Sequence, residues 1–279
     1  MLTMREVSRY FDRTIVTDPD TGAGLFRAQF ANYDGSKRDA YAAYRRVMSV
    51  DPDVVIPVDR CIAAMGHTWI LGDGHPEGWE QLHRRKFVAH RALGGARLYT
   101  LAGFLDGDPP RVTWGDIQWL GTTAEEGISS ALPDLYLAIL PDNQAADQYD
   151  IIEVGGTTIL VRAAAHFASG FMEARGYQQP ADALQAVVIL HRKFNPATGG
   201  YDLLASASAP SVKARWQELF QYTDQLDERF QEGDAVLAVP AGTIVQMSDR
   251  LERAGEEFLI QNLTPMAGVL VIHVRPAGP

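Results

Sequence analysis

Hydrophobic and polar residues alternate in short runs along this chain, and turn-forming residues interrupt the runs about every eight to twelve residues from residue 14 onward. Apolar runs at 54–58 and 236–242 have the length of strands, and Leu135–Leu140 predicts a buried strand. Residues 150–161 predict two strands around a Gly155-Gly156 turn, which suits a tight hairpin. This rhythm is typical of sandwiches and barrels, and it predicts a mainly β chain of tandem small β-barrels with a few short helices.

Helical spacing is confined to three stretches. Residues 37–47 and 82–91 are candidate helices, and residues 163–175 are a third candidate. In the third stretch Phe167, Phe171 and Met172 recur at helical spacing, and Gly176 follows as a C-cap would. Residues 1–13 are interpreted as a short helix or arm.

The two ends of the chain share a turn with the same chemistry. Asp18-Pro19-Asp20-Thr21-Gly22 is matched by Asn195-Pro196-Ala197-Thr198-Gly199, at an offset of 177 residues (195 − 18). In both, Asp or Asn starts the turn through its side chain, Pro fixes φ, and Gly supplies a positive φ. Alternating apolar residues flank both turns, which indicates a hairpin in each case.

Two further blocks follow each turn in the same order. Asp53 with the apolar run after it matches Asp234 with its own apolar run, at an offset of 181 (234 − 53). Gly66-His-Thr-Trp-Ile-Leu then matches Gly255-Glu-Glu-Phe-Leu-Ile, at an offset of 189 (255 − 66). Three matches in the same order predict a duplicated unit.

The repeat divides the chain into three parts. We expect an N-terminal barrel with a short arm at 1–95, a middle β-rich domain with a helix at 96–180, and a C-terminal barrel at 181–279. Residues 156–161 of the middle part resemble the third block, so a degenerate third copy is a hypothesis here. A chain of 279 residues accommodates two or three domains.

Charge and composition narrow the function classes. The net charge of −10 disfavours tight DNA binding through phosphate neutralisation, but it does not disfavour a surface that DNA passes. No apolar stretch is long enough for a membrane helix, and no secretory signal is evident at the N-terminus. We therefore expect a protein that is made in a cytoplasm.

Candidate chemical groups are few. The single cysteine, Cys61, follows an apolar run and is interpreted as a buried inert thiol. His75, His83 and His90 lack the close spacing of zinc ligands and lie among cations, so we interpret them as exposed polar residues and expect no metal. No phosphate loop, dinucleotide fingerprint or nucleophile elbow is present, and the paired acids lie in turns or on opposite strand faces. We expect no catalysis and no cofactor.

One positive segment stands out in this acidic chain. Arg84, Arg85, Lys86 and Arg91 are candidate contacts for DNA phosphates or for an acidic partner, and a solvated face is the alternative. The tryptophans are interpreted as core or interface anchors. Trp114 and Trp119 are five residues apart, so in one strand they would face opposite sides.

The order of motifs over residues 187–275 resembles the small β-barrel of head-closure ("stopper") proteins in the neck of tailed bacteriophages. The motifs are VVILHRKFNPATGGYDLL, SVKARWQEL, GDAVLAVPAG, GEEFLIQNLTP and GVLVIHVR. Residues 14–90 resemble a more divergent copy. A stopper is usually one small barrel, and this chain is two to three times longer, so the resemblance leaves stopper, adaptor and tail-completion roles open.

The resemblance implies a virion protein that is assembled in the host cytoplasm and forms a ring of identical subunits between portal and tail. Its partners would be copies of itself, portal or adaptor proteins, tail proteins and passing DNA, without catalysis. Residues 20–36 and 200–212 are the expected loops for contacts with neighbouring rings.

Three alternatives stay open. One is another virion part made of tandem barrels, such as a tail-tube, baseplate or fibre-attachment protein. The second is a hydrolase on a β scaffold that uses His67, His75 or His83. The third is a β-barrel binding module for a small molecule or oligosaccharide.

Overall fold

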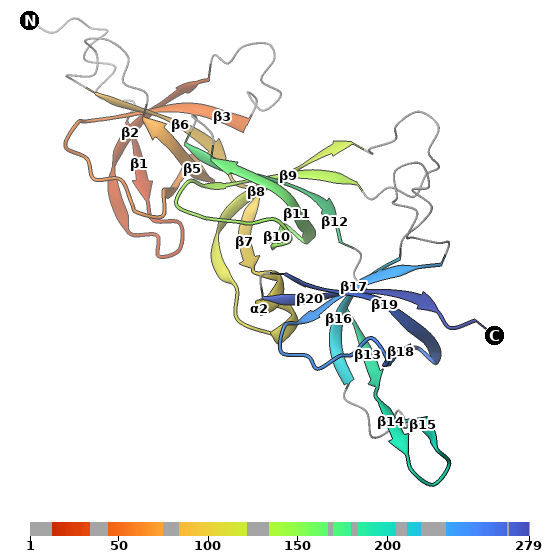
Figure 1. The fold of residues 1–279 in the computed structure, drawn as a ribbon. Helices are drawn as coiled ribbons and strands as arrows, with labels where there is room; N and C mark the ends of the chain where they lie inside the picture. The colour runs from red at the N-terminus through yellow and green to blue at the C-terminus, as the bar shows by residue number, and fades with distance from the viewer. Residues whose placement is uncertain are drawn as a thin grey trace, which may run out of the picture. The chain divides into compact units, whose positions relative to one another are not determined.

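The computed structural model describes residues 13–33, 44–74, 84–121, 134–166, 170–179, 184–204, 211–218, 233–266 and 268–278. These residues form three closed six-stranded barrels and a separate two-stranded hairpin (Figure 1). The prediction of a mainly β chain of tandem barrels is therefore confirmed, and the middle part of the chain forms a complete third barrel. The candidate N-terminal arm lies outside the described residues.

The strands follow one another along the chain, barrel by barrel. The first barrel contains β1 (Thr14–Thr17), β2 (Gly24–Asn32), β3 (Arg45–Val50), β4 (Cys61–Ala64), β5 (His67–Gly74) and β6 (Arg85–Arg91). The second contains β7 (Gly94–Tyr99), β8 (Arg111–Gly121), β9 (Leu135–Pro141), β10 (Ile151–Val154), β11 (Thr157–His166) and β12 (Phe171–Gln178). The third contains β13 (Leu184–Leu190), β16 (Ser211–Glu218), β17 (Ala235–Pro240), β18 (Arg250–Arg253), β19 (Glu256–Met266) and β20 (Val269–Pro276).

All three barrels have the same topology. When the strands of each barrel are counted from its first, the order around the wall is 1-2-3-6-5-4 in every case. The connection between the first and second strands differs in kind from barrel to barrel. It is a turn in the first barrel, the helix α2 (Leu101–Asp106) in the second, and the hairpin of β14 (Arg192–Asn195) and β15 (Gly200–Leu203) in the third. The repeated unit is therefore a whole barrel, and its first connection carries a different element in each copy.

The segment from the third to the fifth strand keeps a constant length. Gly66, Gly156 and Gly255 occupy the same turn at offsets of 90 and 189 residues (156 − 66 and 255 − 66). The residue before each glycine also has a positive φ, although only one of the three is Gly: Met65 has 55°, Gly155 has 57° and Ala254 has 52°. Two successive positive φ values are the geometry of a two-residue hairpin turn that matches strand twist.

The connection between the third and fourth strands of each barrel, here called the mouth loop, comprises residues 51–60, 141–150 and 240–249. Each mouth loop opens with a backbone hydrogen bond from its fourth residue to its first, and it closes with a second one. The sixth residue of each loop, Ile56, Ala146 or Val245, is partly buried against the core of its own barrel. The mouth loop thus closes one end of the core.

Alternating inward residues build each core. Met48, Trp69 and Phe87 contribute to the first core, and Leu237, Phe258 and Ile272 contribute to the third. A small inward residue recurs on the second strand as Ala28, Gly115 and Ala214, next to the equivalent pairs Gln29–Ser49, Asp116–Ile139 and Arg215–Ala238. A Cβ on Gly115 would lie 2.8 Å from the Leu140 side chain, so the second barrel admits no larger residue there.

The first and third of the matched blocks are confirmed as local structure. Gly22 N donates to Asp18 O at 2.9 Å, and Gly199 N donates to Asn195 O at 3.0 Å. The side-chain oxygens of Asp18 and Asn195 each accept a backbone N–H two residues on. The first turn joins two barrel strands, whereas the second forms the tip of the β14–β15 hairpin.

The matching of Asp53 with Asp234 is wrong. Asp53 lies in a mouth loop, while Asp234 directly precedes the strand β17. The apolar run at 54–58 resembles a strand in sequence because Val54 and Ile56 pack on the core. Val55 and Val58 of the same run are 85% and 88% exposed, and the run pairs with no described strand.

The helices predicted at 82–91 and 163–175 are also wrong. The first region contains β6, and the second contains the ends of β11 and β12. Met172 faces the core of its barrel while the adjacent Phe171 belongs to a cluster outside it, so both faces of the strand are buried and the alternation is lost. Gly176 lies within β12, where it pairs with Val161 next to a bulge. Most of 37–47 lies outside the described residues, and its end begins β3.

The proposed loops at 20–36 and 200–212 are largely strands. Residues 24–32 form β2, and residues 200–203 and 211 onward belong to β15 and β16. Residues 34–36 and 205–210 lie outside the described part of the chain.

The chain forms two compact units. Among the described residues, one unit comprises the first two barrels, and the other comprises the third barrel together with residues 99–110. Within the first unit, Ile70 and Ala92 of the first barrel pack with Leu137, Ile139 and Phe171 of the second. We call this cluster the barrel junction. Within the second unit, α2 lies against β16 and β17.

Candidate interaction surface

The mouth loops of the first and third barrels expose apolar side chains at equivalent positions. Val55 and Ile244 are 85% and 74% exposed, and Val58 and Met247 are 88% and 53% exposed. The second barrel has Ala145 and Gln148 at these positions. Because neighbouring loop residues pack inward, the exposure follows from the fixed loop geometry. Exposed apolar residues that gather on one loop are typical of contact surfaces.

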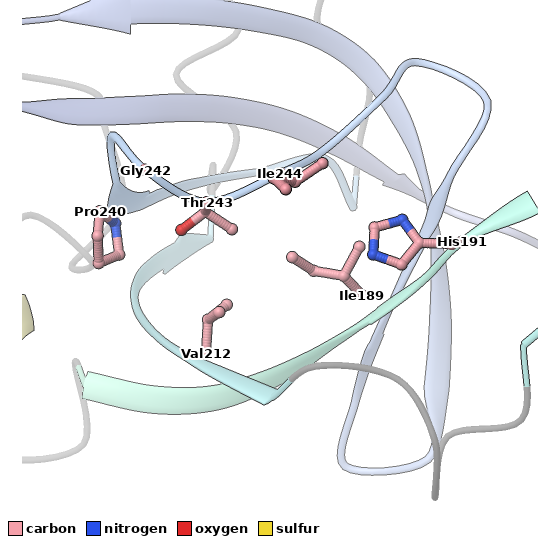
Figure 2. A pocket seen from close by; sticks show the side chains of 7 residues that line it. All are labelled: Ile189, His191, Val212, Pro240, Gly242, Thr243 and Ile244. Atoms are coloured by element: carbon pink, nitrogen blue, oxygen red, sulfur yellow. The ribbon is translucent and has the colours of Figure 1, made fainter.

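A shallow apolar pocket of about 400 Å³ lies beside the mouth loop of the third barrel (Figure 2). Ile189 and Val212 come from β13 and β16, and Pro240, Thr243 and Ile244 come from the end of β17 and the loop. Gly242 and His191 complete the lining. Most of the lining is apolar, so a hydrophobic side chain of a partner would be accommodated better than a charged one.

His191 is fixed in place by Asp249. Its Nδ1 lies 3.0 Å from Oδ2 of Asp249, which also accepts the backbone N–H of Gln246 at 2.8 Å. The other carboxylate oxygen accepts the N–H of Arg192 at 3.3 Å. In the second barrel Asp150 accepts the N–H of Asp147 in the same way, at 2.9 Å. The aspartate at this position therefore closes the mouth loop in both barrels. In the third barrel it also holds His191.

The β14–β15 hairpin begins directly after His191 and extends beyond the barrel (Figure 1). Leu204 N donates to His191 O at 3.1 Å and closes its base. Phe194 and Tyr201 are 53% and 59% exposed, and their ring centroids lie 5.4 Å apart in an edge-on arrangement. The Arg192 guanidinium lies over the Tyr201 ring, 4.4 Å from its centroid. The hairpin, pocket and mouth loop together make the candidate interaction surface of the third barrel.

The barrel junction combines apolar packing with buried charge. His90 has no exposed surface, and its Nε2 donates to Oδ2 of Asp116 at 2.8 Å. Burial opposes ionisation of Asp116, yet hydrogen bonds from His90 and Gln118 outweigh it and hold the pKa of this carboxyl below 3.8. Arg45 lies 3.9 Å from Glu173 across the same junction. The interpretation of His90 as an exposed polar residue is therefore wrong.

The four predicted partner-facing cations do not form one cluster. Arg84 donates to the side chain of Gln29, and Arg85 donates to Val54 O at 3.1 Å and lies over the Phe87 ring. Lys86 lies on the opposite face of β6 from Arg85, and Arg91 is exposed at the far end of the strand. Because side chains alternate between the two faces of β6, cations that are neighbours in the sequence lie on opposite faces of the strand.

Other sequence-predicted residues have clear positions. Cys61 is buried, and burial together with the nearby Asp59 raises its pKa to about 12, which fits the inert thiol predicted. Trp114 is half-buried at the barrel junction, whereas Trp119 is 60% exposed, so the two tryptophans differ as expected. His75 and His83 lie outside the described residues.

The described residues contain no group of three or more His, Cys, Asp or Glu side chains placed to hold a metal ion. No described helix has the length and hydropathy that a membrane span requires. Sequence reasoning missed the pairing of His191 with Asp249 and the exposure of Phe194 and Tyr201. The alternating residues of 192–195 and 200–203 were visible, but nothing in the sequence showed that this hairpin stands apart from a barrel.

Comparisons with models of protein families, with curated proteins and with solved structures found no match.

Proposed function

We propose that this chain is a structural virion protein of a tailed phage, a ring-forming neck component that joins the portal-bearing head to the tail and lines the DNA channel. The observation that carries the proposal is the candidate interaction surface of the third barrel, which combines a shallow apolar pocket with an exposed apolar mouth loop and a hairpin that exposes two aromatic side chains. The third barrel is also the region whose motifs resemble stopper proteins.

The tandem barrels support an assembly role in physical terms. A closed barrel leaves no unpaired strand edge, so a chain of barrels can pack side by side without uncontrolled strand pairing. Contacts between different surfaces of identical subunits close into a ring when the rotation allows it. The exposed mouth-loop residues Val55 and Ile244 provide equivalent apolar contacts at two places on the chain.

The charge of the chain suits a channel wall. With a net charge of −10, the subunit repels phosphates on average and lets DNA pass without holding it. We expect no retention of duplex DNA by the purified protein at physiological salt.

The decisive experiment has two parts. The purified chain is imaged by negative-stain microscopy, and an antibody against it is used to label particles of the virus that encodes it. We expect rings of uniform size, and label at the joint between head and tail. Label at the tail tip or baseplate would overturn the neck assignment in favour of another virion part, and absence from the particle would overturn the virion assignment.

One observation favours a second candidate function, a hydrolase. His191 is held by Asp249 and lines the same pocket as Thr243. A histidine oriented by a carboxylate is the arrangement of a general base. Ester and phosphoester substrates should be turned over only by the parent chain if this candidate is right, and His191→Gln should abolish turnover. Equal background rates in both proteins would eliminate it.

A further inference from the structure

The β14–β15 hairpin differs from every other described strand pair because its sheet is open. All other described strands belong to closed barrels, whereas β14 and β15 pair only with each other. Arg192, Lys193 and Phe194 on β14 are exposed, as are Tyr201 and Asp202 on β15. A two-stranded ribbon of this size is marginally stable in water, and its two edges present unpaired backbone groups.

The register of the hairpin makes its two strands chemically complementary. Lys193 lies opposite Asp202, and Phe194 lies opposite Tyr201. Side chains alternate between the two faces, so one face carries the aromatic pair with Arg192, and the other carries the opposite charges of Lys193 and Asp202, with Asn195 donating to Asp202. Each strand is therefore a suitable neighbour for the other strand of a second copy.

We propose that the hairpins of neighbouring copies pair edge to edge, so that β14 of one copy adds to β15 of the next. This inference rests on the proposed ring assembly and names the contact within it. In a ring all hairpins point the same way, so β14 and β15 alternate in direction and each new contact is antiparallel, like the one inside the hairpin. The Lys193–Asp202 and Phe194–Tyr201 pairs then recur at each subunit boundary, and the free edges disappear.

Cross-linking between two variants, each with one cysteine added to the buried Cys61, tests the edges directly. Lys193→Cys and Asp202→Cys are mixed at equal concentration and treated with a short bis-maleimide, which tolerates a register shift of one residue. We expect a covalent dimer in the mixture and little in either variant alone. The parent chain, whose Cys61 is buried, and a mixture of Lys193→Cys with Glu256→Cys on the exposed β18–β19 turn serve as controls.

A charge-reversal mixture tests the same contact without cross-linking. Lys193→Asp and Asp202→Lys each place like charges opposite one another within every hairpin and between copies, so each alone should associate several-fold more weakly than the parent. In an equal mixture, alternating copies restore opposite charges at every boundary while each hairpin keeps its own like pair. Recovered association in the mixture, measured by sedimentation velocity, therefore reports the contact between copies.

The outcomes separate this inference from the proposed function. Rings that form while the mixture of Lys193→Cys and Asp202→Cys gives no covalent dimer would overturn the hairpin contact and leave the ring proposal standing. Cross-linking of Lys193→Cys to itself would overturn the head-to-tail arrangement in favour of a back-to-back dimer. A chain that stays monomeric at every concentration would overturn both.

Discussion

At the scale of single residues, close backbone approach decides which positions cannot change. Gly176 lies on β12 beside the bulge in β11, and a Cβ there would lie 2.3 Å from the carbonyl oxygen of Leu160. The contact is with backbone, so rotation of a side chain cannot relieve it. In the sequence, the same glycine suggested the end of a helix. Sequence alone does not distinguish a glycine that permits close backbone packing from a glycine that ends a helix.

The first prediction concerns this contact. Gly176→Ala should lower the free energy of unfolding by about 1–3 kcal/mol, because the added methyl must displace a paired strand. Gly95→Ala in β7 of the same barrel is the matched control, since a Cβ at Gly95 meets nothing within 4 Å. Urea unfolding followed by tryptophan fluorescence measures both variants. Equal midpoints for the two would contradict the close approach.

The second prediction concerns the pH dependence of the barrel junction. Because the pKa of Asp116 is held below 3.8, its contribution to stability is present above about pH 4 and is lost as the pH falls through the lower, folded-state value. Asp116→Asn should cost about 1–3 kcal/mol at pH 7 by weakening the bond to His90, and it should flatten the loss of stability below pH 4.

Urea midpoints from pH 7 to pH 3 measure this effect, with the exposed Asp53→Asn in the same unit as the control. An Asp116→Asn variant that loses stability with acid as steeply as the parent does would show that the titrating group lies elsewhere.

At the scale of elements, the mouth loop separates structural from exposed residues within a few positions. Val245 packs on the third core, while its neighbour Ile244 is 74% exposed. The third prediction is that Val245→Ala lowers the free energy of unfolding by about 1 kcal/mol, since a partly buried side chain loses part of the transfer free energy. Ile244→Ala should leave it within about 0.5 kcal/mol of the parent.

Thermal unfolding of the two variants provides the comparison. A larger effect at Ile244 than at Val245 would mean that the loop packs with its other face inward. If Ile244→Ala also weakens self-association while its stability is unchanged, the residue acts at an interface.

The sequence predicts elements well where turn chemistry or an unbroken apolar run marks them. The Gly155-Gly156 turn and the turns at Asp18 and Asn195 were predictable from turn chemistry, and Leu135–Leu140, which is buried on both faces, was predictable as an apolar run. The prediction fails at Phe171 and His90, where a second barrel also covers the outer face but polar and charged residues interrupt the apolar run, so neither alternation nor a continuous run is left. It also fails at Val54 and Ile56, where a loop carries strand-like spacing. The basic run was visible in sequence, but its division between two faces of β6 required the strand.

At the scale of the whole molecule, the barrel junction makes the first two barrels one unit. The fourth prediction is that Phe171→Ala, which empties a fully buried position in this junction, destabilises both barrels together by about 3–5 kcal/mol. Hydrogen exchange should then accelerate in strands of the first and second barrels, while β17 and β20 of the third barrel keep their protection.

The matched variant is Leu237→Ala in the third core, which should accelerate exchange in the third barrel alone. Acceleration in the third barrel with Phe171→Ala, or in the first barrel with Leu237→Ala, would show that the two units do not unfold separately.

The equal length of the segment from third to fifth strand has a consequence for how this chain can vary. The two hairpin-turn residues and the sixth mouth-loop residue recur at fixed spacing in all three barrels, so the segment of one barrel can replace that of another. Grafting the second barrel's mouth loop, with Ala145 and Gln148, into the first or third barrel would remove the exposed apolar side chains without altering the chain length. Contact specificity can therefore diversify barrel by barrel while the scaffold stays the same.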